Sequence, residues 1–195
     1  MFPIFPLNGA ILFPGTNLPL NIFEEKYIQM VDYALSNNRV IGMIQKKENK
    51  EFFNIGCLGK ITNFTETDDG RYQINLQGVS RFRFKKILKN DYKFITIDAD
   101  ILKENKVIKN KDVTNKKLLS SFNKFLKLKK INFDTSEFIN LNSSNLAKII
   151  CVISPLDYLI KQMLLEFDSD DDLCKNLLSV LEIEMQNSEN NYKVN

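Results

Sequence analysis

The sequence contains no histidine, the side chain that most often performs acid–base chemistry near neutral pH. Ser-His-Asp and Cys-His nucleophilic sites are therefore excluded, together with imidazole metal sites. Gly56–Ile61 comes nearest to a phosphate-binding loop, but its spacing differs from G-x-x-x-x-G-K-[ST] and Gly59-Lys60 falls inside an expected strand. We expect no catalytic residue, no cofactor site and no enzymatic activity, although chemistry carried by Asp, Glu or Lys alone stays open.

Acidic and sulfur-containing residues do not form a recognisable metal site. Asp170-Asp171-Asp172 are consecutive, so on a helix they point in different directions and cannot converge on an ion; a solvated, acidic first turn is the better interpretation. The three cysteines, Cys57, Cys151 and Cys174, are far apart and form no C-x-x-C pair. We expect buried thiols, no metal, no disulfide and a reducing, cytoplasmic location.

A basic strip interleaved with aromatic residues is the first candidate binding surface. It contains Arg81, Arg83, Lys85, Lys86, Lys89 and Lys93, with Phe82, Phe84 and Tyr92 between them. Such a pattern can bind RNA through phosphate contacts and base stacking. Alternation along a strand favours another interpretation, in which Phe82 and Phe84 face the core and the cations cover a solvated face. A net charge of +3 also demands no nucleic-acid partner.

The opening stretch from Phe2 to Tyr27 is the second candidate. Its four prolines exclude a helix and favour short extended segments bent at Asn8-Gly9 and Pro14-Gly15. Some of its apolar residues are candidates to line a groove for a partner, and the favoured interpretation makes all of them core. The candidate residues are Phe2, Phe5, Phe13, Leu18 and Leu20.

Alternating residues predict a β-rich first half. A helix is predicted over Glu24–Asn37, followed by strands over Val40–Gln45 and Ile55–Glu66. Thr67-Asp68-Asp69-Gly70 predicts a hairpin, and a strand from Tyr72 bends at Gly78 before a further strand over Ile95–Ile101. Short strands joined by tight turns indicate a partly closed antiparallel barrel.

Helical periodicity dominates the second half, including a helix that starts at Ser154-Pro155. We predict an α+β protein with a β domain at 1–103, a linker at 104–115, a helical bundle at 116–187 and a frayed tail at 188–195. No apolar run approaches the ~18 residues of a membrane span, and no secretory signal is visible.

Three blocks of sequence resemble the Lon N-terminal domain, the substrate-binding module of ATP-dependent Lon proteases. They are FPL, LFPG and LPLNIFEEKY in the opening, IGCLGKI at Ile55–Ile61, and DGRYQINLQGVSRFRF at Asp69–Phe84. The resemblance implies a PUA-like pseudo-barrel with one helix, followed by a helical bundle. It also implies a stand-alone binding part without the ATPase and Ser-Lys peptidase modules. The expected partners are unfolded or tagged protein segments, or a protease or chaperone; the alternative is a PUA-like RNA-binding protein using Arg81–Lys93.

Overall fold

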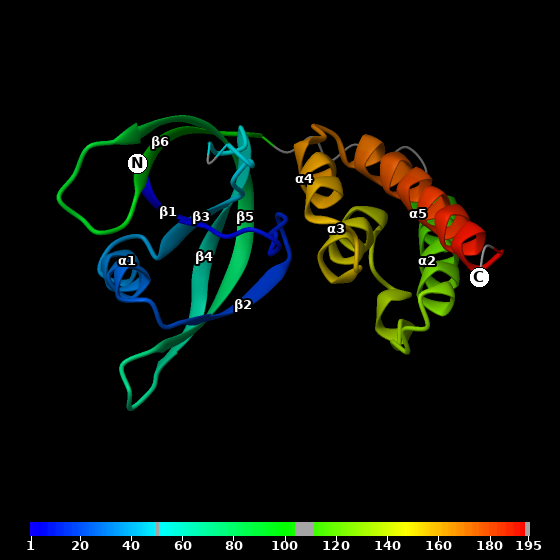
Figure 1. Cartoon of the computed structure of the whole chain (residues 1–195), viewed down its shortest axis with the longest axis horizontal. Helices are drawn as coiled ribbons and strands as arrows, with labels where there is room; N and C mark the ends of the chain where they lie inside the picture. The colour runs from blue at the N-terminus through cyan, green and yellow to red at the C-terminus, as the bar shows by residue number, and fades with distance from the viewer. Residues whose placement is uncertain (50, 104–110, 194–195) are drawn as a thin grey trace. The chain divides into compact units, whose positions relative to one another are not determined.

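The computed structural model describes residues 1–49, 51–103 and 111–193, and over these it has an α+β fold (Figure 1). Cα packing divides the chain into two compact units. The β unit comprises Met1–Glu104 together with Leu156–Leu165, and the helical unit comprises Asn105–Pro155 together with Glu166–Asn195.

A six-stranded mixed sheet forms the β unit. Its strands are β1 (Phe2–Pro6), β2 (Asn17–Ile22), β3 (Val40–Ile44), β4 (Ile55–Glu66), β5 (Tyr72–Leu88) and β6 (Thr96–Ile101). They follow the order β2-β5-β4-β3-β1-β6, and β5 also pairs with β6, which closes the sheet on itself. The predicted antiparallel barrel is wrong in one pairing, because β1 and β3 are parallel. The chain passes through β2 and helix α1 (Glu25–Leu35) between them, and such a crossover permits parallel pairing.

The β4–β5 hairpin matches its sequence prediction closely. Strand β4 has the predicted bounds, and the turn places Gly70 at φ 77°, where a side chain would be strained. The ladder between the strands shifts register between Leu58 and Gly59 and again between Ile61 and Asn63. At Gly78, an added Cβ would lie 2.0 Å from the backbone oxygen of Phe13. The opening stretch therefore packs directly against β5 where a side chain would collide with it.

Helix α4 (Tyr158–Glu166) differs most from the sequence expectation, because residues 156–165 belong to the β unit and not to the predicted bundle. The predicted helix start at Ser154-Pro155 is also wrong. Helix α3 ends at Ile153, Ser154 is extended, and the Asp157 carboxylate accepts a hydrogen bond from the Leu159 N–H at 2.8 Å at the start of α4. The break at Pro155 frees the following helix to pack against the strands.

Three α-helices and a short 3-10 helix make up the described part of the helical unit. They are α2 (Lys111–Leu128), η1 (Ser136–Phe138), α3 (Ser143–Ile153) and α5 (Asp170–Lys193). The predicted linker overlaps α2 from Lys111, and its residues 104–110 lie outside the described residues. The predicted tail is helical to Lys193. In the described part of the chain, no helix is long and apolar enough to span a membrane.

Asp170 corrects the interpretation of the acidic triplet as a solvated turn. Its carboxylate lies 3.0 Å from the Lys148 ammonium group, and both side chains are buried. Ser169 accepts a hydrogen bond from the backbone N–H of Asp172 at 3.1 Å, and the prediction that the triplet forms the first turn of a helix is confirmed. Across the described residues, no group of three or more acidic or cysteine side chains is arranged to hold a metal ion.

Candidate functional site

A surface hollow of about 640 Å³ lies within the β unit, on the segment that joins β5 to β6. Residues 87–95 line it, and the segment between β5 and β6 forms the wide green loop of the β unit (Figure 1). Loops on a rigid sheet are favoured positions for binding residues, because the scaffold holds them while their side chains stay accessible.

Asn90 organises this loop through three hydrogen bonds. Its side-chain amide donates to the Thr96 hydroxyl at 2.7 Å and to the Leu88 backbone oxygen at 3.3 Å. Its side-chain oxygen accepts from the backbone N–H of Tyr92 at 2.9 Å. An Asx turn of this kind fixes the residue two positions on, so the loop presents Tyr92 in a defined orientation.

Tyr92, Phe94 and Tyr33 form a three-ring surface that we call the aromatic shelf. The Tyr92 ring stacks on Phe94 with centroids 4.8 Å apart and planes at 5°. Tyr33, from α1, lies 5.1 Å from Tyr92 and 5.4 Å from Phe94. Phe94 is buried whereas Tyr92 is 51% exposed, so the stack places a fixed aromatic ring at the surface.

Two further features shape the surroundings of the aromatic shelf. Ile87 lines the same hollow and is 55% exposed, which adds apolar surface beside the rings. The Lys93 ammonium lies 2.5 Å from a carboxylate oxygen of Glu25 in the first turn of α1, and this ion pair joins the loop to the helix. The result is an aromatic and aliphatic surface with a charged border.

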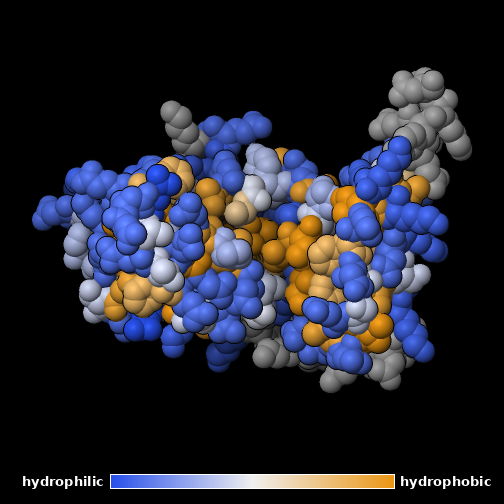
Figure 2. All heavy atoms as spheres, turned by 90° about the horizontal axis from the view of Figure 1, so that it is seen from below, coloured by the Kyte–Doolittle hydropathy of each residue, from blue (hydrophilic) through white to orange (hydrophobic). Residues whose placement is uncertain are grey.

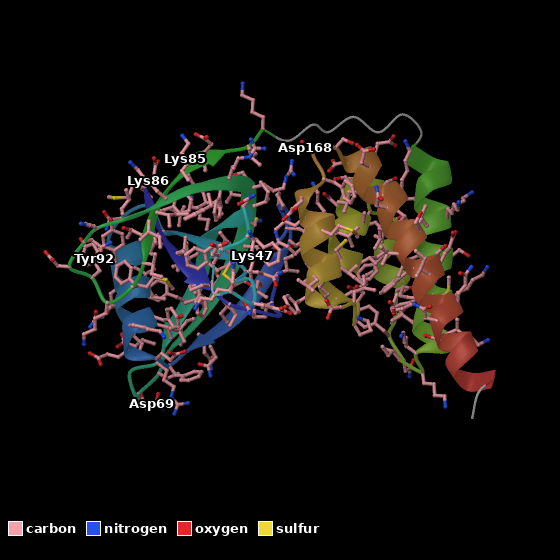
Figure 3. All side chains as sticks on the ribbon, turned by 45° about the horizontal axis from the view of Figure 1, so that its top comes forward. Lys47, Asp69, Lys85, Lys86, Tyr92 and Asp168 are labelled. Carbon is pink, nitrogen blue, oxygen red and sulfur yellow. The ribbon has the colours of Figure 1, made fainter. Side chains whose placement is uncertain are left out.

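The predicted basic strip does not form one cationic surface. Arg81 is buried and donates from Nη1 to the backbone oxygen of Leu165 on α4 at 3.3 Å. The prediction that it lies on a solvated face is wrong, because α4 covers that part of β5. Lys85 pairs with Asp100 at 2.6 Å. In Figure 3, Lys85 and Lys86 lie on β5, and Tyr92 lies on the loop that follows.

Exposed cations remain on the strip at Arg83, Lys86 and Lys89, for which the described residues supply no ion-pair partner. Phe82 is fully buried and Phe84 is half-buried, so the inward direction predicted for Phe82 is confirmed. The strip therefore offers three separate positive charges and no run of stacked, exposed rings along the strand.

The apolar residues of the opening stretch are mostly core. Phe2, Phe5 and Phe13 are buried, which corrects the expectation that they form a surface groove. The Phe2 ring meets Phe82 edge-on, with centroids 5.1 Å apart. Leu18 and Leu20 lie on β2 and stay half-buried. The apolar side chains of this stretch therefore pack against α1 and β5 and close the barrel.

Sequence reasoning found Tyr92 but missed its partners. Tyr33 lies outside the apolar stripe of α1, and Phe94 stands in a polar loop, so neither belongs to a periodic pattern. The available signal was the Asn90-Asp91 pair beside closely spaced aromatic residues, which is typical of an ordered turn.

Figure 2 shows a face on which hydrophilic residues predominate, with smaller hydrophobic patches on each unit.

Comparisons with known proteins place this geometry in context. The family model described as the ATP-dependent protease La (LON) substrate-binding domain matches residues 1–182. The Lon protease of Buchnera aphidicola subsp. Acyrthosiphon pisum is 28% identical over 193 residues, which cover 94% of this chain and 25% of that protein. The Lon protease of Escherichia coli K12 is 24% identical over 195 residues, with coverages of 94% and 25%. The chain spans about a quarter of the length of these relatives.

Solved structures share the fold. A Lon N-terminal domain protein from Xanthomonas campestris superposes with a TM-score of 0.66 at 18% identity, over 91% of this chain and 96% of that one. The N-terminal domain of a Mycobacterium avium complex Lon protease gives a TM-score of 0.70 at 15% identity, with coverages of 93% and 97%. At these identities the comparison establishes the fold, and the sequence prediction of an α+β fold is confirmed.

Proposed function

The chain belongs to the family of ATP-dependent protease La (LON) substrate-binding domains, and from this membership we propose that it is a non-catalytic module that binds segments of unfolded or tagged proteins. The barrel would be of the PUA-like type and the protein cytoplasmic. Docking on a protease or chaperone is the related form of the same function, in which the bound segment belongs to a folded partner.

The aromatic shelf is the observation that carries this proposal within the molecule. Tyr92 and Ile87 expose apolar surface at a position fixed by Asn90 and by the stack on Phe94. Exposed apolar surface of this kind marks partner sites in soluble proteins, and tyrosine is favoured there because it offers large contact area with few rotatable bonds. A segment of unfolded chain supplies the exposed apolar side chains that such a surface accepts.

RNA binding is the competing function, and the described surface supports it less well. It would draw on Arg83, Lys86 and Lys89, since Arg81 is buried and Lys85 and Lys93 are engaged by carboxylates. Asp100 and Asp98 on β6 stand opposite Arg83 and Lys86 in the sheet and lower the local positive potential. Affinity for RNA would fall steeply with salt, whereas apolar contact with a polypeptide would not.

The proposal is tested by titrating the protein with a labelled, permanently unfolded polypeptide, with single-stranded RNA as competitor. We expect saturable binding that survives added salt and that weakens about tenfold in Tyr92→Ala, in line with the loss of an aromatic contact at an interface. Tyr158→Ala, at the start of α4, is the control. Absence of binding to the unfolded polypeptide, or equal binding by the two variants, contradicts the proposal; salt-sensitive binding of RNA alone selects the competing function.

A further inference from the structure

The helical unit carries a strongly basic helix that the proposed function does not use. Between residues 115 and 130, α2 and its C-terminal turn contain lysine and no acidic residue. The lysines are Lys116, Lys117, Lys124, Lys127, Lys129 and Lys130. Lys129 is engaged by Glu184 at 3.4 Å. For Lys116, Lys124 and Lys127, the described part of the chain supplies no ion-pair partner, and all three are exposed.

Two hollows lie on this helix and share Lys124 and Lys127 as lining residues. One, of about 680 Å³, extends from these lysines to Met185 and Glu182 on α5. The other, of about 520 Å³, extends along α2 to Lys116. We call the pair the lysine groove. Lys116 and Lys127 are eleven residues apart, so the cations span about 16 Å of helix, the length of about five residues of extended chain.

Apolar side chains line the groove between the cations. Leu128 and Met185 line the larger hollow, and Leu119 lines the smaller one. The lysine stems add methylene groups to the same surface while their ammonium groups stay in water. Glu182 is the acidic lining residue, and the described lysines of the groove outnumber it. Positive charge above an apolar floor selects a ligand that is both acidic and partly apolar.

We propose that the lysine groove binds an acidic segment of a partner polypeptide in which aspartate or glutamate residues are interspersed with aliphatic ones. Carboxylates would meet Lys116, Lys124 and Lys127, and aliphatic side chains would contact Leu128 and Met185. The flexible thioether of Met185 allows one surface to accept segments of different sequence. This surface belongs to the helical unit and is independent of the aromatic shelf.

Nucleic acid fits the groove less well than an acidic polypeptide. No aromatic side chain lines either hollow among the described residues, so bases would find no stacking surface. The cations are lysines without arginine, which removes the bidentate contacts that favour phosphate. Aliphatic lining residues also contribute nothing to a phosphate backbone but bury the side chains of a peptide.

The experiment measures binding of short labelled peptides to the full chain by fluorescence anisotropy. One peptide intersperses Asp and Glu with Leu and Met, a second replaces the acids by Lys, and a third probe is single-stranded RNA. We expect the acidic peptide to bind more tightly than the Lys-containing peptide and the RNA, with an affinity that falls as salt is raised. The double variant Lys124→Glu/Lys127→Glu should weaken it about tenfold or more, because attraction becomes repulsion at both positions.

Matched variants keep the result interpretable. Lys124→Gln/Lys127→Gln should give an intermediate loss of affinity for the acidic peptide, because it removes attraction without introducing repulsion. Lys60→Glu/Lys86→Glu is the control for the charge change. It places the same change on exposed lysines of the β unit and should leave the affinity within about twofold of wild type. Unfolding midpoints verify that each variant folds. Equal binding by the Lys124/Lys127 variants, equal binding of the Lys-containing peptide, or preferential binding of RNA overturns the proposal. If the aromatic shelf does not bind polypeptide, this shows separately, as absent binding of the labelled unfolded polypeptide in the titration described under the proposed function.

Discussion

The side-chain amide of Gln162 donates a hydrogen bond of 3.0 Å to the backbone oxygen of Ile55, a residue 107 positions earlier in the chain. Gln162 belongs to α4 and Ile55 begins β4, and both are buried. Together with the Arg81 contact to Leu165, this bond ties a helix from the second half of the sequence to the sheet of the first. The β unit therefore includes a segment that, in the sequence, follows residues 105–155 of the helical unit.

Replacing Gln162 by Leu should destabilise the protein. The substitution keeps the side chain at similar size but leaves the Ile55 carbonyl oxygen buried without its donor, which costs about 1–3 kcal/mol. The free energy of unfolding from chemical denaturation measures the change. Gln29→Leu is the matched control, because Gln29 also lies on a helix but its amide makes only a 3.5 Å contact with Glu25 near the surface. Equal losses in the free energy of unfolding of the two variants would show that the buried hydrogen bond contributes no more than the contact near the surface.

A feature of the fold could be predicted from the sequence when its interacting residues are close together in the chain, and could not when they are far apart. Alternation in β4 and the Asp-Gly turn are local signals, and both were predicted with correct positions. The burial of Arg81 depends on α4, 84 residues away, and periodicity cannot encode such a contact. The parallel pairing of β1 with β3 depends on the same kind of long-range arrangement.

Prediction of the candidate site was limited in the same way. Tyr92 stood in the basic strip recognised from sequence, but the aromatic shelf also needs Tyr33 from α1. The opening stretch illustrates the opposite error. Phe2, Phe5 and Phe13 have the composition of a binding surface, yet the closed sheet needs apolar residues on its inner face and buries them. Composition alone cannot separate these two uses of the same residue types.

Tyr72 should link stability to alkaline pH. Its hydroxyl donates to Asp32 at 2.8 Å, and this hydrogen bond, with burial, raises the Tyr72 pKa from its ordinary value of about 10 to about 12. A folded-state pKa above the unfolded value contributes stability that is complete below about pH 10 and is lost as the pH rises through about 12. Tyr72→Phe should lower stability by about 1 kcal/mol at neutral pH and remove this contribution to the alkaline loss.

Absorbance titration of the tyrosines measures the raised pKa, and denaturation curves between neutral pH and about pH 13 measure the loss of stability. The tyrosine that titrates latest in the wild type should be missing from Tyr72→Phe. Tyr158→Phe is the control, since the described residues supply no hydrogen-bond partner for the Tyr158 hydroxyl. An unchanged late titration in Tyr72→Phe would assign that step to another tyrosine.

The buried pair of Lys148 and Asp170 should stabilise the helical unit only as a pair. Asp170→Asn removes the carboxylate that pairs with the buried Lys148 ammonium group, and a loss of about 3–5 kcal/mol is typical of breaking such pairs. Lys148→Met/Asp170→Leu should lose much less, because neither charge of the pair then remains buried. A double-mutant cycle in chemical denaturation measures the coupling. The exposed pair Lys175–Asp171 provides the comparison, with less than about 1 kcal/mol expected.

Cys174 should be chemically inert in the folded protein. Burial, and secondarily the nearby charge of Asp170, raises the pKa of its thiol to about 12 from an ordinary value of 9.0. Only the thiolate reacts readily, so little reaction is expected at pH 8. A variant with Cys57→Ala and Cys151→Ala isolates this thiol for measurement with a disulfide reagent. Reaction should be slow in buffer and fast in denaturant; fast reaction in both would contradict the assigned environment.

Asn90 should control binding at the aromatic shelf without controlling global stability. Asn90→Ala removes the three hydrogen bonds that fix the loop, so Tyr92 loses its defined orientation and binding must then order the loop. We expect affinity for the unfolded probe to fall about tenfold, while the free energy of unfolding falls by only about 1 kcal/mol because the loop lies at the surface. Asn49→Ala is a close control, since the Asn49 side-chain oxygen also accepts from the backbone N–H two residues on, at 3.1 Å. Equal affinity in both variants would mean that the orientation of Tyr92 does not matter, whereas a selective loss in Asn90→Ala would connect loop geometry to recognition.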